Sequence, residues 1–192
     1  MSYRFARTML SAACLLLPAV AVATDLIPVE DFARHVMLSQ PTLSPDGQHI
    51  AVNMNDIGGD SHALAVYDVS EMSRPVSMLR LPKYEIAASI TWASNTRLVV
   101  EKGKQFGSID KPAMTGEIIA SDIDGKNQDY LYGFEGKLGT RAGTRGTDRG
   151  WGFVDGLPAP VNGHFYMATQ NWDSRDYSTL YDVNAGKNTR HL

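Results

Sequence analysis

The sequence predicts an all-β fold, and three observations lead to that prediction. Short runs of apolar, β-branched and aromatic residues recur after residue 40, and turn residues separate them. Turn formers are plentiful, with 17 glycines and 9 prolines among 192 residues. Finally, the order in which turns and strands follow one another repeats along the chain. Such a repeat indicates similar structural units placed one after another.

The best-specified turn lies at residues 44–47 (Ser-Pro-Asp-Gly), between two short apolar runs. The proline fixes its own φ, the aspartate can bond a neighbouring amide, and the glycine supplies a positive φ. After it, Ile50 and Val52 alternate with small or polar neighbours, as a half-buried strand does. The stretch therefore predicts a β-hairpin over residues 43–55.

The rest of the chain contains further strands of the same kind. We expect them at residues 63–69, 76–81, 89–92, 97–101, 117–123, 129–134, 165–169 and 178–183, with a last strand starting near Leu192. The third strand of each set ends in an aspartate followed by a β-branched residue (Asp68-Val69, Asp122-Ile123 and Asp182-Val183), and the aspartates are 54 and 60 positions apart. The repeat predicts an incomplete β-propeller of about three four-stranded antiparallel blades.

The predicted blades cover about residues 40–82, 88–135 and 152–192, within a partial propeller over residues 40–192. An ordinary meandering sandwich is the alternative. Three blades are too few for a typical ring of about four to eight. We therefore expect either a piece of a longer protein or another element covering the open edge.

The N-terminus resembles a secretory signal peptide. Arg4 and Arg7 precede an apolar run over residues 9–22, and small residues before Thr24 suit cleavage after Ala23. The run is short for a membrane span, so an N-terminal anchor helix is the less favoured alternative. Residues 1–23 are thus expected to be removed. The remaining chain is expected to be periplasmic or secreted, with no membrane contact after cleavage.

The segment over residues 24–39 is predicted to contain a short helix that packs on the following domain. Pro28 and two carboxylates suit its first turn, and Phe32 and Val36 fall on one face. Loss of residues 1–23 changes the formal net charge from −3 to −5 and removes the single cysteine, Cys14. Nucleic acid is therefore not a favoured partner, and disulfide or thiolate chemistry is excluded from the mature chain.

Residues 43–51 (Leu-Ser-Pro-Asp-Gly-Gln-His-Ile-Ala) resemble the blade motif of TolB-like propellers, in which tryptophan is commoner at the position of Leu43. Trp92 restores that aromatic residue in the second blade, although Ser-Asn-Thr at residues 94–96 replaces Pro-Asp-Gly. The signal peptide followed by residues 27–32 (Ile-Pro-Val-Glu-Asp-Phe) resembles the start of secreted prolyl oligopeptidase-family serine peptidases, of dipeptidyl or acylaminoacyl peptidase type.

Thr91-Trp92 followed by residues 97–100 (Arg-Leu-Val-Val) is also similar to that family, and the resemblance covers most of residues 24–192. It implies an N-terminal propeller that gates or orients peptide substrates for a C-terminal α/β-hydrolase domain with a Ser, Asp and His triad. The chain has no Gly-x-Ser-x-Gly motif, so that domain would lie beyond Leu192 and no catalytic residue is assigned. The alternatives are a periplasmic TolB-like binding module without enzymatic activity, and an independent small β domain that dimerises through its open edge. The oligomeric state is not predicted.

A glycine-rich segment over residues 136–150 supplies the candidate substrate-contact residues. Arg141, Arg145, Arg149 and the following Trp151 could contact an anionic group of a substrate. The alternative is a long inter-blade insertion kept soluble by its charge. The aromatic residues that could line a pocket near this segment, or else belong to the core, are Trp151, Phe153, Trp172 and Tyr177.

No cofactor or metal is predicted. Asp56, Asp60 and His62 offer suitable metal-binding atoms, but their spacing matches no calcium or zinc motif, and a solvated loop is the favoured interpretation. The five histidines are scattered without catalytic or metal-binding spacing.

Overall fold

The computed structural model describes residues 27–28, 36–55, 61–106, 111–134 and 147–192. The predicted signal peptide and Phe32 of the helix expected within residues 24–39 lie outside these residues. The part of that prediction that reaches Val36 is wrong, because Val36 is non-helical and 67% exposed and a strand, Leu38–Leu43, begins two residues later. The chain divides into two units, Met1–Arg34 and His35–Leu192, and every described strand belongs to the second. Among the described residues, no helix is long and apolar enough to cross a membrane.

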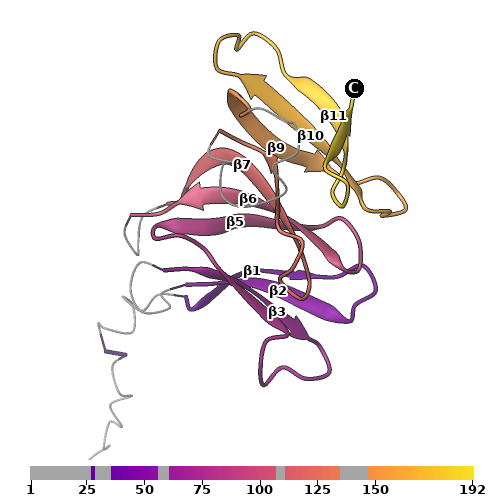
Figure 1. Cartoon of the computed structure of the whole chain (residues 1–192). Coiled ribbons are helices and arrows are strands. Elements are labelled where there is room, and N and C mark those ends of the chain that lie inside the picture. Colours follow the sequence, from indigo (N-terminus) through magenta and orange to yellow (C-terminus); the bar gives the residue numbers. More distant parts are fainter. Residues whose placement is uncertain (1–26, 29–35, 56–60, 107–110, 135–146) are drawn as a thin grey trace, which may run out of the picture. The chain divides into compact units, whose positions relative to one another are not determined.

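The predicted all-β fold is confirmed: the second unit forms three four-stranded antiparallel sheets (Figure 1). The first sheet contains β1 (Leu38–Leu43), β2 (His49–Met54), β3 (Ala63–Asp68) and β4 (Ser77–Arg80). The second contains β5 (Glu85–Trp92), β6 (Arg97–Lys104), β7 (Ala113–Asp122) and β8 (Asp129–Tyr132). The third contains β9 (Gly150–Gly156), β10 (His164–Asn171), β11 (Thr179–Asn184) and β12 (Thr189–His191). Each sheet is a meander in which strands adjacent in sequence pair, consistent with three blades of an incomplete propeller.

The turn between β1 and β2 forms as its sequence predicts. Gly47 has a φ of 72°, and its N–H donates to the carbonyl of Ser44 at 2.9 Å. The Ser44 hydroxyl donates to Asp46 Oδ1 at 2.6 Å and accepts from the N–H of His49 at 2.9 Å. The bond from Ser44, together with one from the Gln48 amide, lowers the pKa of Asp46.

Strand β6 explains how the three sheets pack, because successive side chains of a strand point to opposite faces. Leu98 and Val100 belong to a core with residues of the first sheet, including Leu64 and Val66. Val99, between them, belongs to a second core. The other members of that second core include Ile118 and Leu131 of the second sheet and Phe165, Met167 and Val183 of the third. The second sheet is therefore buried on both faces, which accounts for the uninterrupted apolar run Leu98–Val99–Val100 in β6.

Several strands extend further than the sequence analysis expected. β5 begins at Glu85 rather than residue 89, β6 continues to Lys104, and β7 begins at Ala113. The added residues include charged and polar side chains that interrupt the apolar pattern. Residue 150, expected to end a loop, instead begins β9.

Candidate functional site

A cavity of about 200 Å³ opens where β6, β7, β9 and β10 begin or end. Lys104 ends β6, Thr115 and Glu117 belong to the first half of β7, and Gly150 begins β9. Phe134 and Trp172 follow β8 and β10, so residues from both the second and third sheets contribute. The lining residues are Lys104, Thr115, Glu117, Phe134, Gly150 and Trp172.

Aromatic rings stack beside this cavity. The ring centroids of Phe134 and Trp172 are 5.4 Å apart, and Trp151 meets Trp172 edge to face at 6.0 Å. The Arg175 guanidinium lies over Trp151, with its Cζ 4.9 Å from the ring centroid, and the Cζ of Arg149 lies 5.9 Å from that of Trp172. We call these five residues the aromatic–arginine surface.

This surface is open to solvent. Phe134 is 46% exposed, and the Arg149 side chain is 59% exposed. Arg149 Nε lies 3.4 Å from Asp173 Oδ2, whose side chain is also well exposed. Exposed pairs of this kind contribute about 0–1 kcal/mol. A ligand carboxylate could therefore replace Asp173 at little cost.

A buried ionic cluster adjoins the cavity through Glu117. Lys102 is 2% exposed, and its Nζ lies 2.8 Å from Glu85 Oε2 and 2.9 Å from Glu117 Oε2. Nζ also donates to the hydroxyl of Tyr130 at 2.8 Å. Burial alone would lower the pKa of Lys102, but the bonds to Glu85, Tyr130 and Glu117 outweigh it and raise that pKa. Burial also raises the pKa of Tyr130.

Gly116 explains why Trp151 can sit so close to β7. Gly116 has a φ of +76°, and a Cβ at this position would lie 2.7 Å from the Cα of Trp151. Any larger residue would displace the tryptophan. Because Trp151 contacts both Trp172 and Arg175, the backbone of β7 sets the position of the aromatic–arginine surface.

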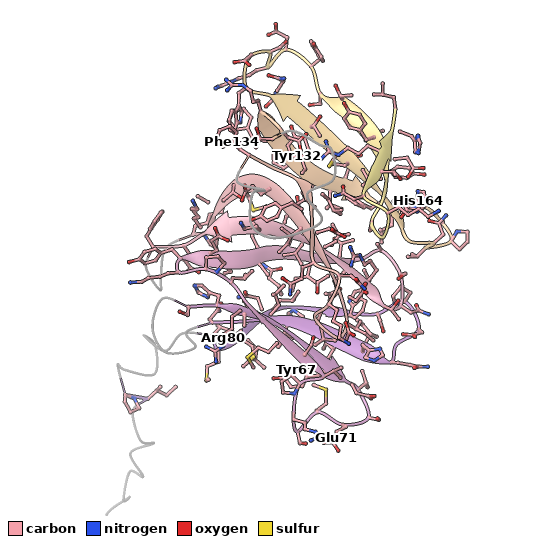
Figure 2. All side chains as sticks on the ribbon, viewed as in Figure 1. Tyr67, Glu71, Arg80, Tyr132, Phe134 and His164 are labelled. Atoms are coloured by element: carbon pink, nitrogen blue, oxygen red, sulfur yellow. The ribbon has the colours of Figure 1, made fainter. Side chains whose placement is uncertain are left out.

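Asp148, two residues before β9, is held in place by Arg190 and by the backbone of Gly133. Arg190 donates to both carboxylate oxygens of Asp148, each at 2.8 Å. Asp148 Oδ2 accepts the N–H of Gly133 at 3.2 Å, and the N–H of Asp148 donates to the carbonyl of Gly133 at 3.1 Å. The Arg190 guanidinium also lies over Tyr132, which is close to Phe134 (Figure 2). These contacts place Arg149 beside the cavity.

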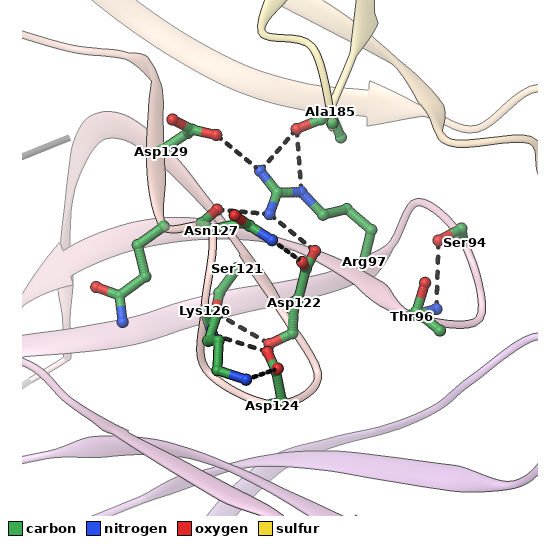
Figure 3. Close-up of polar contacts among 12 residues, drawn as sticks. Ser94, Thr96, Arg97, Ser121, Asp122, Asp124, Lys126, Asn127, Asp129 and Ala185 are labelled. Carbon is green, nitrogen blue, oxygen red and sulfur yellow. Dashed lines mark hydrogen bonds and ion pairs between the residues drawn. The ribbon is translucent and has the colours of Figure 1, made fainter. Parts of the chain in front are cut away.

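Arg97 makes a second polar centre, but all its contacts are structural (Figure 3). Its Nε and Nη2 donate to the carbonyl of Ala185 at 3.0 and 2.9 Å. Nη1 lies 3.0 Å from Asp122, and Nη2 lies 3.1 Å from Asp129. Arg97 is 5% exposed, so it joins the second and third sheets rather than facing a ligand.

The structure brings together two of the four candidate contact residues. Arg149 and Trp151 both belong to the aromatic–arginine surface, although Trp151 lies on a strand and not in a loop. Arg141 and Arg145 lie outside the described residues. The sequence analysis did not identify Arg175. This residue belongs to a polar stretch after Trp172, and only the fold brings that stretch into contact with Trp151 of β9.

None of the remaining described candidates lines the cavity. Phe153 and Tyr177 are 40% and 65% exposed and belong to neither core. Asp56 and Asp60 lie outside the described residues, whereas His62 is buried with its Nδ1 3.2 Å from Asn55 Oδ1. Within the described part of the chain, no group of three or more metal-binding side chains occurs.

No protein-family model matches this chain, and no curated protein matches it. Two solved structures are similar at low identity. A conserved lipoprotein from Clostridium novyi NT is 10% identical with a TM-score of 0.42, over 78% of this chain and 86% of the lipoprotein. Puromycin hydrolase is 21% identical with a TM-score of 0.44, over 81% of this chain. The match spans 22% of puromycin hydrolase.

Proposed function

We propose that this chain is the non-catalytic propeller portion of an exported prolyl oligopeptidase-family serine peptidase, in which it orients peptide substrates. The observation that carries the proposal is the aromatic–arginine surface beside a cavity. Tryptophan and arginine are enriched among residues that dominate the energetics of protein and peptide binding. The choice of this family rests on the blade motif at residues 43–51 and on the resemblance of residues 27–32 to the start of such peptidases.

The surface offers a peptide two kinds of contact. The indoles of Trp151 and Trp172 provide large rigid apolar area, which loses little conformational entropy on binding. The guanidiniums of Arg149 and Arg175, positioned against those rings, can direct N–H donors to a carboxylate or carbonyl oxygen. Bond cleavage through an acyl-enzyme would belong to a separate hydrolase domain.

Two measurements on the purified full chain test this role. Calorimetric titration with short peptides should detect binding, and Trp172→Ala should weaken it by about tenfold or more, as expected for a central aromatic contact. Incubation with chromogenic dipeptide substrates should give no turnover. Turnover that a serine-directed inhibitor abolishes would overturn the non-catalytic role.

A TolB-like periplasmic binding module is the second candidate, because the same surface would serve a partner without any attached enzyme. The coding sequence past Leu192 discriminates between them. A Gly-x-Ser-x-Gly motif followed by Asp and His supports the peptidase. Further blades followed by a stop codon support the binding module.

A further inference from the structure

We propose that the cavity beside Trp172 takes the side chain of a tyrosine residue in a bound peptide. This inference rests on the proposed function and adds a preference for one class of peptide. It follows from the size of the cavity, its aromatic wall and the two opposite charges among its lining residues.

The size of the cavity limits its occupant. Pockets for whole small ligands typically enclose about 300–1,000 Å³. At about 200 Å³, this cavity suits one side chain of a longer ligand whose remainder lies outside. The aromatic–arginine surface shares Phe134 and Trp172 with the cavity lining and can hold that remainder.

The wall of the cavity suits an aromatic ring. Phe134 and Trp172 contact each other and both line it, so together they present one aromatic side. Aromatic rings pack favourably on such surfaces in offset or edge-to-face geometry. A tyrosine ring resting there would cover part of Phe134, which is 46% exposed in the free chain.

The charged lining residues determine which chemical group can stand at the end of the bound side chain. Lys104 and Glu117 both line the cavity, and Nζ of the buried Lys102 lies 2.9 Å from Oε2 of Glu117. A charged tip of either sign would be attracted by one of these two residues and repelled by the other, and it would lose hydration on entry. A phenol is neutral, donates one hydrogen bond and accepts another, so it can interact with both residues. Phenylalanine would fill the space without those bonds.

The test uses the full chain labelled with ¹⁵N, whose three tryptophans report binding through their indole N–H signals. The probes are the N-acetyl amides of tyrosine, phenylalanine, lysine and glutamate, which share a neutral backbone. The tyrosine probe should shift the Trp172 signal saturably, with a dissociation constant about three- to tenfold lower than that of the phenylalanine probe. Trp92, which is 3% exposed in the core between the first and second sheets, should not respond.

A matched pair of variants separates the polar contribution from the apolar one. Lys104→Met should reduce the tyrosine preference over phenylalanine to about twofold or less, because the hydrogen bond from the lysine ammonium to the phenol oxygen is lost. Lys126→Met is the control, since that side chain is 77% exposed in the turn between β7 and β8, and it should leave the preference unchanged.

The outcomes distinguish this inference from the proposed function. If longer peptides bind by calorimetry but the four probes bind equally, or the lysine or glutamate probe binds best, the tyrosine preference is wrong and the peptide-orienting role stands. Probe binding that moves Trp92 and leaves Trp172 unchanged also overturns the inference. If neither probes nor longer peptides bind, both proposals fail.

Discussion

Arg97 and Ala185 join two sheets across 88 positions of sequence, with two guanidinium N–H groups donating to one main-chain carbonyl. The same guanidinium binds Asp122 and Asp129, so it links the end of β7, the start of β8 and the turn after β11. Because Arg97 is buried, water could not take its place if the guanidinium were removed, so the link contributes strongly to stability.

Arg97→Met should lower the free energy of unfolding by about 3–5 kcal/mol, because it leaves the buried Asp129 carboxylate and the Ala185 carbonyl without their donor. Urea unfolding followed by circular dichroism measures this change. Lys126→Met removes an exposed ion pair and should change the free energy of unfolding far less. Equal losses in the two variants would mean that Arg97 does not hold the sheets together.

Lys102 should stabilise the fold in a pH-dependent way. Its folded-state pKa is raised above the unfolded value, so its contribution is fully present below the unfolded pKa of about 10.4 and is lost as pH rises toward the folded value. The difference in unfolding free energy between the native chain and Lys102→Met should therefore shrink from pH 10 upward. Urea titrations between pH 8 and pH 12 measure it. A difference that widens over this range would show that the cluster does not favour the charged lysine.

Two glycines with positive φ allow crowding to be separated from backbone strain. Gly163→Ala places a Cβ in open space. It should therefore lower the free energy of unfolding by only about 1–2 kcal/mol, the cost of a left-handed conformation for a residue with a side chain. Gly116→Ala carries the same strain and also drives a Cβ into Trp151, so it should cost clearly more and change the near-ultraviolet circular dichroism of tryptophan. Identical stabilities and spectra would refute the close packing of β7 on Trp151.

In the β1–β2 turn, the effect of one hydrogen bond on the pKa of Asp46 can be measured. Ser44→Ala removes the main bond that lowers the pKa of Asp46, so that pKa should rise toward its ordinary value. The stabilisation linked to this lowered pKa is present above the unfolded value of about 3.9 and is lost as pH falls, and the variant should lose it. NMR titration of the Asp46 carboxyl measures the shift. Ser70→Ala should instead raise the pKa of Asp68, whose main bond comes from Ser70, and leave Asp46 unaffected.

The local features of this fold could be predicted from sequence because local chemistry specifies them. Gly47 and its neighbours define a turn without help from the rest of the chain, and alternating apolar residues identify the strand centres. The strand ends at Glu85 and Lys104 could not be predicted in this way, since charged residues interrupt the pattern. For Glu85, the partner that permits burial, Lys102, is on another strand.

The candidate site depends still more on tertiary structure. Arg149 and Trp151 stood out as a basic and aromatic stretch, and both belong to the site. Arg175 joins them only because β9 and β10 pair, which brings the segment after Trp172 next to the start of β9. Phe134, Thr115 and Lys104 come from three further segments that no spacing rule connects.

Hydrogen–deuterium exchange of the full chain, with and without a saturating tyrosine-containing peptide, tests whether peptides bind at the aromatic–arginine surface. Exchange should slow at the start of β9 and around Trp172, and it should stay unchanged in β1 to β4. Protection confined to the first sheet, with the same peptide bound, would show that peptides bind away from the aromatic–arginine surface.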